Sequence, residues 1–544
     1  MIRTVVALHS WRSVALLGMA VLLWPATSGC SWGTGSPPGG PKPKTQAAKV
    51  DIEKLRPAVA AFCGDCHAVP PASSFVRSDW FKEVQQGYEF YWNSGRTDLV
   101  EPAMKDVVAY FQSQAPEELE YRPAAYSDHP LPVRFRRQDL ALPEEKKSSA
   151  GVSSIVWQSA AGLEPGRLLF TDMLHGDVCA VNLNDELRVQ RLARISNPAN
   201  VEIADLDADG RTDYLVAELG SFPPQDHNRG QLLWLRPDGI RGFESHILLR
   251  DLGRVAKAVA GDFDGDKDTD VLVAEFGWRR TGKIHLLRRS GDETGLPKFE
   301  DEIVDKRHGA SHLVPLDWDA DGDLDFVALI SQEHEKVELF LNDGSGKFEI
   351  ETIFAAGDPA FGSSGIELND LDGDGDLDVL YTNGDSLDSM TPKPYHAVRW
   401  LENRGSFPFQ DRLLAPMPGV YKAVAADFDG DGDLDVAAVA FPTQWAAPHS
   451  DETPQAASKF DFLILLEQTQ AGRFVRHRLE APAEGLALAA ADFDADGDVD
   501  LASGSFTRAA KQVWLTIWWN DGPASESAAR NPATKERLNE PAPN

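Results

Sequence analysis

Short apolar runs separated by polar turns recur along residues 133–521 of this 544-residue chain. Val271–Phe276 and Leu324–Ile330 are rich in Val, Leu and Ala and are bounded by turn residues, which is typical of buried β-strands. Residues 421–478 contain four such runs in succession: YKAVAAD, LDVAAVAF, FDFLILLEQ and RFVRHRL. Four short strands in a repeating unit of about 40–60 residues predict the blade of a β-propeller.

A nine-residue acidic phrase, D-x-D-x-D-G-x-x-D, occurs six times in the same phase of this repeat, at intervals of roughly 50–65 residues. Carboxylates at positions 1, 3, 5 and 9 and a backbone carbonyl at position 7 can supply the oxygen shell that Ca²⁺ prefers. Glycine at position 6 permits the sharp turn around an ion. The phrase therefore predicts about six calcium ions, one in each loop.

The predicted ligands are the Asp residues of each phrase and the position-7 residue. They are Asp205, Asp207, Asp209, Arg211 and Asp213; Asp262, Asp264, Asp266, Asp268 and Asp270; Asp317, Asp319, Asp321, Asp323 and Asp325; Asp370, Asp372, Asp374, Asp376 and Asp378; Asp427, Asp429, Asp431, Asp433 and Asp435; and Asp492, Asp494, Asp496, Asp498 and Asp500.

The acidic phrases have two other possible interpretations. EF-hands are excluded, because they need a Glu at position 12 between two helices, whereas position 12 here is Val, Ala, Tyr or Ser within a strand-like run. Solvated acidic turns remain the alternative to metal sites. The second loop is the least regular, since Lys267 replaces the glycine, and we expect it to bind calcium most weakly.

These motifs resemble the FG-GAP/VCBS repeat family, the integrin-alpha-like calcium propellers, over residues 133–521. The resemblance implies structural calcium sites on one rim of a ring.

Residues 154–191 have the same succession of strand-like runs, with AAGLEPG in place of the acidic loop, and we count them as a seventh blade. The last unit lacks its fourth strand, and residues 133–140 resemble that strand. We therefore expect a seven-bladed all-β propeller over 123–522, closed by that strand, and a disordered tail over 523–544.

The first 30 residues have the features of an export signal. An apolar run, Val14–Trp24, follows two arginines and is too short to span a bilayer. Thr27-Ser28-Gly29 before Cys30 resembles a bacterial lipoprotein cleavage site, which would make Cys30 the lipidated residue of a membrane anchor; an ordinary secretion signal is the alternative. Residues 31–50, rich in Gly and Pro, are expected to form a flexible linker.

The second strong motif is Cys63-Gly64-Asp65-Cys66-His67, the C-x-x-C-H sequence of c-type haem attachment. Cys63 and Cys66 would form the thioethers of a covalent haem c, and His67 would ligate the iron. A redox dithiol and half of a zinc site are the alternatives. Zinc is disfavoured because no further Cys or His lies between residues 68 and 128.

Three helices are expected around this motif, over residues 51–63, 78–93 and 102–115, with Ser78 as an N-cap. This outline resembles a small all-α cytochrome c-like domain over 51–122, preceding the propeller. In such domains a late Met is the usual sixth haem ligand, which makes Met104 the candidate. Met104 also fits the apolar face of its helix, and a five-coordinate iron is the competing possibility.

Charge and cysteine content disfavour two further classes of protein, nucleic-acid-binding proteins and disulfide-rich proteins. The formal net charge is −32, most of it in the acidic phrases, and the chain has no basic stripe, which disfavours nucleic-acid binding. After the assignments above, Cys179 is the only remaining cysteine, so no disulfide framework is expected; it lies in an apolar run and is predicted to be a buried small hydrophobe.

We therefore predict an exported protein of the periplasm or cell envelope, lipid-anchored, in which the haem transfers electrons and the propeller binds a partner. That partner would be an envelope redox protein or a surface glycan or protein ligand. The alternatives are a propeller enzyme acting on an extracellular substrate such as polysaccharide, as dehydrogenase or lyase, and a pure adhesion module. No convincing His/Lys/Arg catalytic cluster is seen. The loops 222–229, 384–396 and 441–452 are the candidate partner-facing segments.

Overall fold

A computed structural model describes residues 51–121, 125–141, 149–160, 166–183, 187–239, 242–293, 295–385, 387, 391–442, 460–479, 484–507 and 513–524. The predicted signal peptide with Cys30, the linker 31–50 and nearly all of the tail lie outside these residues. Met1–Lys49 and Val50–Asn544 form separate units, and only the second is described below. None of the described helices is long and apolar enough to cross a membrane.

Three α-helices and one short 3₁₀ helix precede the strands. They are α1 (Ile52–Cys63), η1 (Ala72–Ser74), α2 (Trp80–Asn93) and α3 (Met104–Gln112). The three predicted helices are thus present, but the second begins at Trp80 instead of residue 78, and the third spans Met104–Gln112 instead of residues 102–115. Asp79, not Ser78, is its N-cap, and no side-chain cap bond forms there. Buried aromatic rings hold the helices together, with Trp80 stacked on Phe111 at a centroid distance of 4.0 Å.

The rest of the described chain is β-structure arranged in antiparallel meanders. Five sheets have four strands each. They are β6 (Pro198–Ala204), β7 (Asp213–Glu218), β8 (Gly230–Pro237) and β9 (Phe243–Leu252); β10 (Val255–Gly261), β11 (Asp270–Glu275), β12 (Lys283–Glu293) and β13 (Leu296–Asp305); β14 (Ala310–Leu316), β15 (Asp325–Ile330), β16 (Lys336–Asn342) and β17 (Phe348–Ala355); β18 (Ser363–Asn369), β19 (Asp378–Asn383), β20 (Ala397–Glu402) and β21 (Gln410–Pro416); and β22 (Val420–Ala426), β23 (Asp435–Ala440), β24 (Leu463–Gln470) and β25 (Arg473–Leu479).

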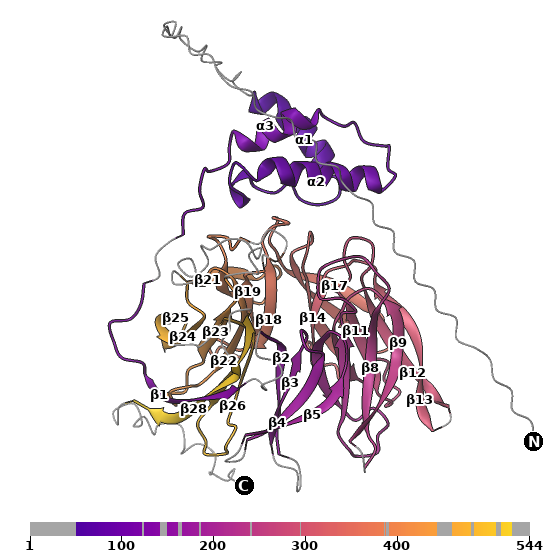
Figure 1. Cartoon of the computed structure of the whole chain (residues 1–544), viewed down its shortest axis with the longest axis vertical. Coiled ribbons are helices and arrows are strands. Elements are labelled where there is room, and N and C mark those ends of the chain that lie inside the picture. Colours follow the sequence, from indigo (N-terminus) through magenta and orange to yellow (C-terminus); the bar gives the residue numbers. More distant parts are fainter. Residues whose placement is uncertain are drawn as a thin grey trace, which may run out of the picture. The chain divides into compact units, whose positions relative to one another are not determined.

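The sixth sheet combines the two ends of the β-region. It contains β1 (Val133–Ala141), β2 (Ala150–Gln158), β3 (Arg167–Asp172), β4 (Asp177–Asn182), β5 (Arg188–Arg194), β26 (Gly485–Ala491), β27 (Asp500–Thr507) and β28 (Val513–Pro523). In Figure 1 the purple strand β1 runs beside the yellow strand β28. Their side chains also meet, since Thr516 Oγ1 donates to Asp139 Oδ1 at 2.9 Å across 377 residues of sequence. This pairing gives β28 the neighbouring strand that its own unit lacks.

Hydrophobic cores lie between consecutive sheets. The second strand of each four-stranded sheet is buried along its whole length, which explains its continuous run of apolar residues. Cys179 is 1% exposed within β4, as predicted. The fold is therefore mainly β, with four-stranded sheets in a propeller-like repeat, and each acidic phrase joins the first strand of a unit to the second.

Candidate metal and haem centres

All six acidic loops share one hydrogen-bond pattern. The first Asp of each phrase accepts from backbone N–H groups later in the same loop; Asp205 accepts from Asp209 and Gly210, each at 3.0 Å. The Asp at position 5 accepts from the N–H of position 7, at 2.8–3.0 Å in all six copies. These bonds wrap the backbone around the carboxylates of positions 1, 3 and 5, so the predicted residues share one local geometry.

Two positions in each loop have left-handed backbone. Position 6 has φ between 74° and 100°, and position 4, always Gly or Ala, is also left-handed. Lys267 adopts φ 74° at position 6 of the second loop, where a side chain is strained. The second loop, in which Lys267 replaces glycine, is therefore strained at position 6.

The carboxylates come close enough to share a cation. One oxygen from each of Asp205, Asp207 and Asp213 lies within 4.8 Å of the others, and the second and third loops bring together the same three positions. In the fourth loop the group is Asp370, Asp372 and Asp374. Buried Asp372 Oδ1 has no hydrogen-bond partner within the described part of the chain. Unpaired buried carboxylate oxygens fit a hard cation such as Ca²⁺.

The Asp at position 9 has a structural role that the sequence did not indicate. It is the first residue of the second strand, and one of its oxygens accepts the N–H of position 2 in every loop. In five loops the other oxygen accepts an N–H from the third strand or, at Asn403, from the residue just after it; Asp325 accepts from Asn342 at 2.7 Å. In the first loop the corresponding residue is Pro237, which has no N–H, so Asp213 Oδ1 lacks this donor.

Arginine side chains distinguish the first two loops from the rest. Arg236 lies 2.6 Å from Asp207, and Arg288 lies 3.0 Å from Asp264. Both Asp residues occupy position 3. Among the described residues, the position-3 carboxylates of the other four loops make no ion pair. The first two loops thus already have part of their charge compensated, and the four later loops depend most on a cation.

Burial perturbs the titration of these loops. It raises the pKa of Asp435 from 3.8 to about 8, with further upward contributions from Asp429 and Asp431 and opposing ones from backbone hydrogen bonds. Burial likewise raises the pKa of Asp270, Asp378, Asp429 and Asp500 to about 6. Without a cation, these carboxylates are therefore costly to ionise in the folded state.

A pH dependence of the calcium-free protein follows from these shifts. Since the folded pKa of Asp435 lies above its unfolded value, its stabilising contribution is complete below pH 3.8 and is lost as the pH rises through about 8. We expect the calcium-free protein to melt at a lower temperature at pH 8 than at pH 5.5, and calcium to reduce this difference. Calorimetry in chelator at both pH values measures it; a calcium-free protein that is more stable at pH 8 would contradict the prediction.

The C-x-x-C-H motif begins at the end of α1, which terminates at Cys63. Cys63 is partly buried and Cys66 is exposed. Burial raises the pKa of the Cys63 thiol to about 11, so this thiol is protonated at neutral pH. Nδ1 of His67 lies 2.7 Å from the carbonyl oxygen of Ala68. When Nδ1 donates this bond, the lone pair remains on Nε2, which is the arrangement of a metal-ligating histidine.

Met104 is the first residue of α3. Cys63 and Met104 both pack against the same aromatic core of the helical region. The residues present therefore fit a covalent haem: one cysteine at the end of α1 and one in the turn that follows it, a histidine whose Nε2 can ligate a metal when Nδ1 donates, and a methionine against the same core as Cys63.

The loops expected to face a partner are tied to the protein in their described parts. His227 Nε2 lies 2.8 Å from Ser221 Oγ, and Phe222 stacks near Phe506. His396 is fully buried and its Nδ1 accepts backbone N–H groups of Lys393 and Gly419. These histidines thus have structural contacts. Most of the 441–452 loop lies outside the described residues.

Comparison with known proteins supports the repeat family. Residues 205–273, 262–328 and 317–381 each match the FG-GAP-like repeat. The chain carries FG-GAP-like repeats. Each match begins at one acidic phrase and ends in the strand that follows the next acidic phrase. The period of the family repeat is therefore the same as the period of the observed sheets. Such repeats indicate a β-propeller-like module of the extracellular binding or adhesion type.

One curated relative and one solved structure add context. The chain is 28% identical to mouse (Mus musculus) cartilage acidic protein 1 over 341 residues, which is 57% of this chain and 48% of that protein. The match thus spans about half the length of the relative. A chain from the crystal structure of BBS1N in complex with ARL6DN, soaked with mercury, aligns with a TM-score of 0.41 and 10% identity over 73% of this chain and 98% of that one.

Proposed function

We propose that this protein is an exported c-type haem protein that transfers single electrons, and that its FG-GAP-like repeat module is a calcium-binding seven-bladed propeller that binds a partner at the cell envelope. The observation that carries the electron-transfer proposal is the geometry of His67, the last residue of the C-x-x-C-H motif, whose Nδ1 lies 2.7 Å from the carbonyl oxygen of Ala68.

The residues of the helical region have separate roles in this proposal. Cys63 and Cys66 would attach the haem through thioethers, and His67 would ligate its iron. Met104 is the proposed second ligand. A bound haem would supply reversible one-electron chemistry. The buried aromatic core, which includes Trp80 and Phe111, provides a rigid support that limits reorganisation around the group.

Calcium in the acidic loops would make the repeat module rigid. Ring closure is supported by the pairing of β1 with β28, which would give the last blade four strands, while β2–β5 would form a blade without an acidic loop. The proposed partner is an envelope redox protein, or a glycan or protein ligand at the surface. Export and a lipid anchor at Cys30 complete the proposal and rest on the sequence pattern alone.

A second candidate is a binding or adhesion module without electron transfer. It is favoured by the FG-GAP-like repeats themselves, which have no need of a haem. A propeller enzyme acting on polysaccharide is the third candidate, and the geometry of the acidic loops offers it no particular support, because carboxylates that hold calcium are not free for acid–base chemistry.

A redox titration separates these candidates. The full chain should be produced in a host with haem-attachment machinery and titrated in calcium, with the reduced haem absorbance as the readout. We expect one reversible one-electron wave per chain, with an unchanged spectrum after repeated cycles. If the protein folds and binds calcium but contains no redox-active haem, the electron-transfer proposal is wrong and the adhesion module is the remaining candidate.

A further inference from the structure

Two loops next to one another in space bring together a histidine–glutamate–histidine cluster outside the acidic phrases. His308 lies between β13 and β14, and Glu333 and His334 lie between β15 and β16. One possible ligand atom from each residue lies within 4.8 Å of the other two. The two imidazole rings are 5.3 Å apart, centroid to centroid.

One ring nitrogen of each histidine in this cluster is buried and makes no hydrogen bond within the described part of the chain. Nε2 of His308 and Nε2 of His334 have no hydrogen-bond partner among the described residues. Nε2 of His308 lies 2.7 Å from Glu333 Oε2, but this approach does not have hydrogen-bond geometry. Buried polar atoms are normally satisfied, so the unpaired His334 Nε2 beside the His308–Glu333 pair needs an explanation.

Among the described residues, Nε2 of His246 and Nε2 of His396 also lack a hydrogen-bond partner, but neither belongs to a histidine–glutamate–histidine group identified in the fold, whereas two other buried histidines are fully or partly paired. His285 uses both ring nitrogens, with Asp301 at 2.8 Å and Glu275 at 3.2 Å. His477 bonds to Glu467 at 2.7 Å. An ion pair of that kind would account for His308 and Glu333 but would leave the His334 nitrogen without a partner.

The two loops are held close by the backbone. The N–H of Ser331 donates to the carbonyl of Gly309 at 2.8 Å. Gly309 has φ 93°, and a Cβ there would come within 2.6 Å of the Ser331 carbonyl oxygen. Only glycine therefore allows this approach, which places Glu333 and His334 beside His308.

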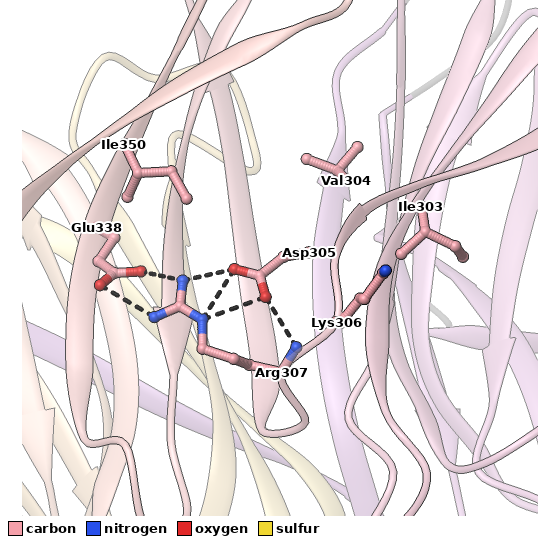
Figure 2. Close-up of a pocket in the computed structure, with 7 residues that line it drawn as sticks. All are labelled: Ile303, Val304, Asp305, Lys306, Arg307, Glu338 and Ile350. Atoms are coloured by element: carbon pink, nitrogen blue, oxygen red, sulfur yellow. Dashed lines mark hydrogen bonds and ion pairs between the residues drawn. The ribbon is translucent and has the colours of Figure 1, made fainter.

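Arg307 fixes the segment that leads into His308. Figure 2 shows its guanidinium between Asp305 and Glu338, in a pocket of about 530 Å³. Arg307 bonds to Asp305 through Nε at 2.9 Å and to Glu338 through Nη1 at 3.1 Å. Two carboxylates on strands β13 and β16 thus hold the loop before His308, and the cluster is built on rigid elements.

We propose that His308, Glu333 and His334 bind a divalent transition metal of the zinc type. Two imidazoles and one carboxylate are a ligand set that suits zinc, and three protein ligands leave one position for water. Calcium prefers an all-oxygen shell of six to eight ligands, which this cluster does not offer. The antiparallel strand order also places the cluster at the opposite end of its sheet from the acidic loop between β14 and β15.

Calorimetric titration with zinc chloride tests the proposal on the full chain, with the acidic loops kept saturated by excess calcium. We expect one zinc per chain, and we expect His308→Ala and His334→Ala each to weaken it by more than about a hundredfold, since even outer-shell partners of a metal change affinity 10–100-fold. His246→Ala is the matched control, because His246 lies 3.6 Å from the single carboxylate of Glu244 and should leave zinc binding unchanged.

Zinc K-edge absorption identifies the ligands and separates this site from Cys63 and Cys66. A first shell of nitrogen and oxygen with imidazole scattering supports the proposal, and a sulfur shell overturns it. Unchanged zinc affinity in both histidine variants also overturns it. If either variant fails to fold in calcium, Glu333→Gln keeps the shape of the side chain; an undiminished zinc affinity in that variant would likewise contradict the proposal.

Discussion

Removing calcium is expected to lower the melting temperature of this protein by about 10 °C or more. A ligand that binds only the native state stabilises it by about 2.7 kcal/mol per site at a hundredfold excess over Kd, and a cost of one kcal/mol shifts the melting temperature of a large domain by a few degrees. Because the chain has six such loops, the total stabilisation free energy from bound calcium should be several times the value for one site. Calorimetry with and without EGTA measures the effect.

Matched aspartates in two loops show whether the effect arises at the predicted sites. Asp427 and Asp262 both occupy position 1 and accept similar backbone bonds, at 2.8 Å from Gly430 and from Gly265. Asp427→Ala should therefore remove more of the calcium-dependent increment in melting temperature than Asp262→Ala, because the second loop has Lys267 and Arg288 beside it. Magnesium should substitute poorly, since it demands a tighter octahedral shell. Equal losses in the two variants would contradict the ranking of the loops.

Replacing both cysteines of the C-x-x-C-H motif is expected to abolish covalent haem. Cys63→Ala/Cys66→Ala removes both thioether donors, so haem should be extracted completely from the denatured protein, whereas the natural chain should retain it. The pyridine haemochrome spectrum after denaturation and extraction measures this. Cys179→Ala is the matched control, because Cys179 is buried in β4 and should not affect haem content.

Haem that stays attached to the doubly substituted protein would show that the motif is not the attachment site. Loss of haem in the Cys179→Ala control would show instead that attachment depends on general stability and not on the motif.

Most of the repeat architecture could be predicted from the sequence, because the strand runs and acidic phrases recur in one phase. The two left-handed positions of each loop were partly foreseeable from Gly at position 6. The role of Pro237 was not, since its missing N–H matters only once β7 pairs with β8. The helix after Ser78 begins later than predicted, since the Ser78 hydroxyl donates to Asp79 Oδ1 at 3.0 Å and Asp79 takes the N-cap position.

Contacts between distant residues were beyond the sequence. Arg288 lies 24 residues from Asp264, in a strand whose register sets their pairing. For the same reason sequence reasoning missed the cluster of His308, Glu333 and His334: it is made by two different loops that only the fold brings together. The sequence contained one signal for this cluster. Glu333 and His334 are adjacent between two predicted strands, and His308 lies in an earlier connection between strands.

The calcium content of the native chain is the most direct test of the central claim, that the acidic loops of the FG-GAP-like repeats are metal sites. The protein should be purified in calcium, exchanged into metal-free buffer, and assayed by elemental mass spectrometry against amino-acid analysis. The account predicts about six calcium ions per chain before exchange and about four after it, retained in the loops without an arginine. A chain that contains no bound calcium, and whose melting is indifferent to EGTA, would contradict it.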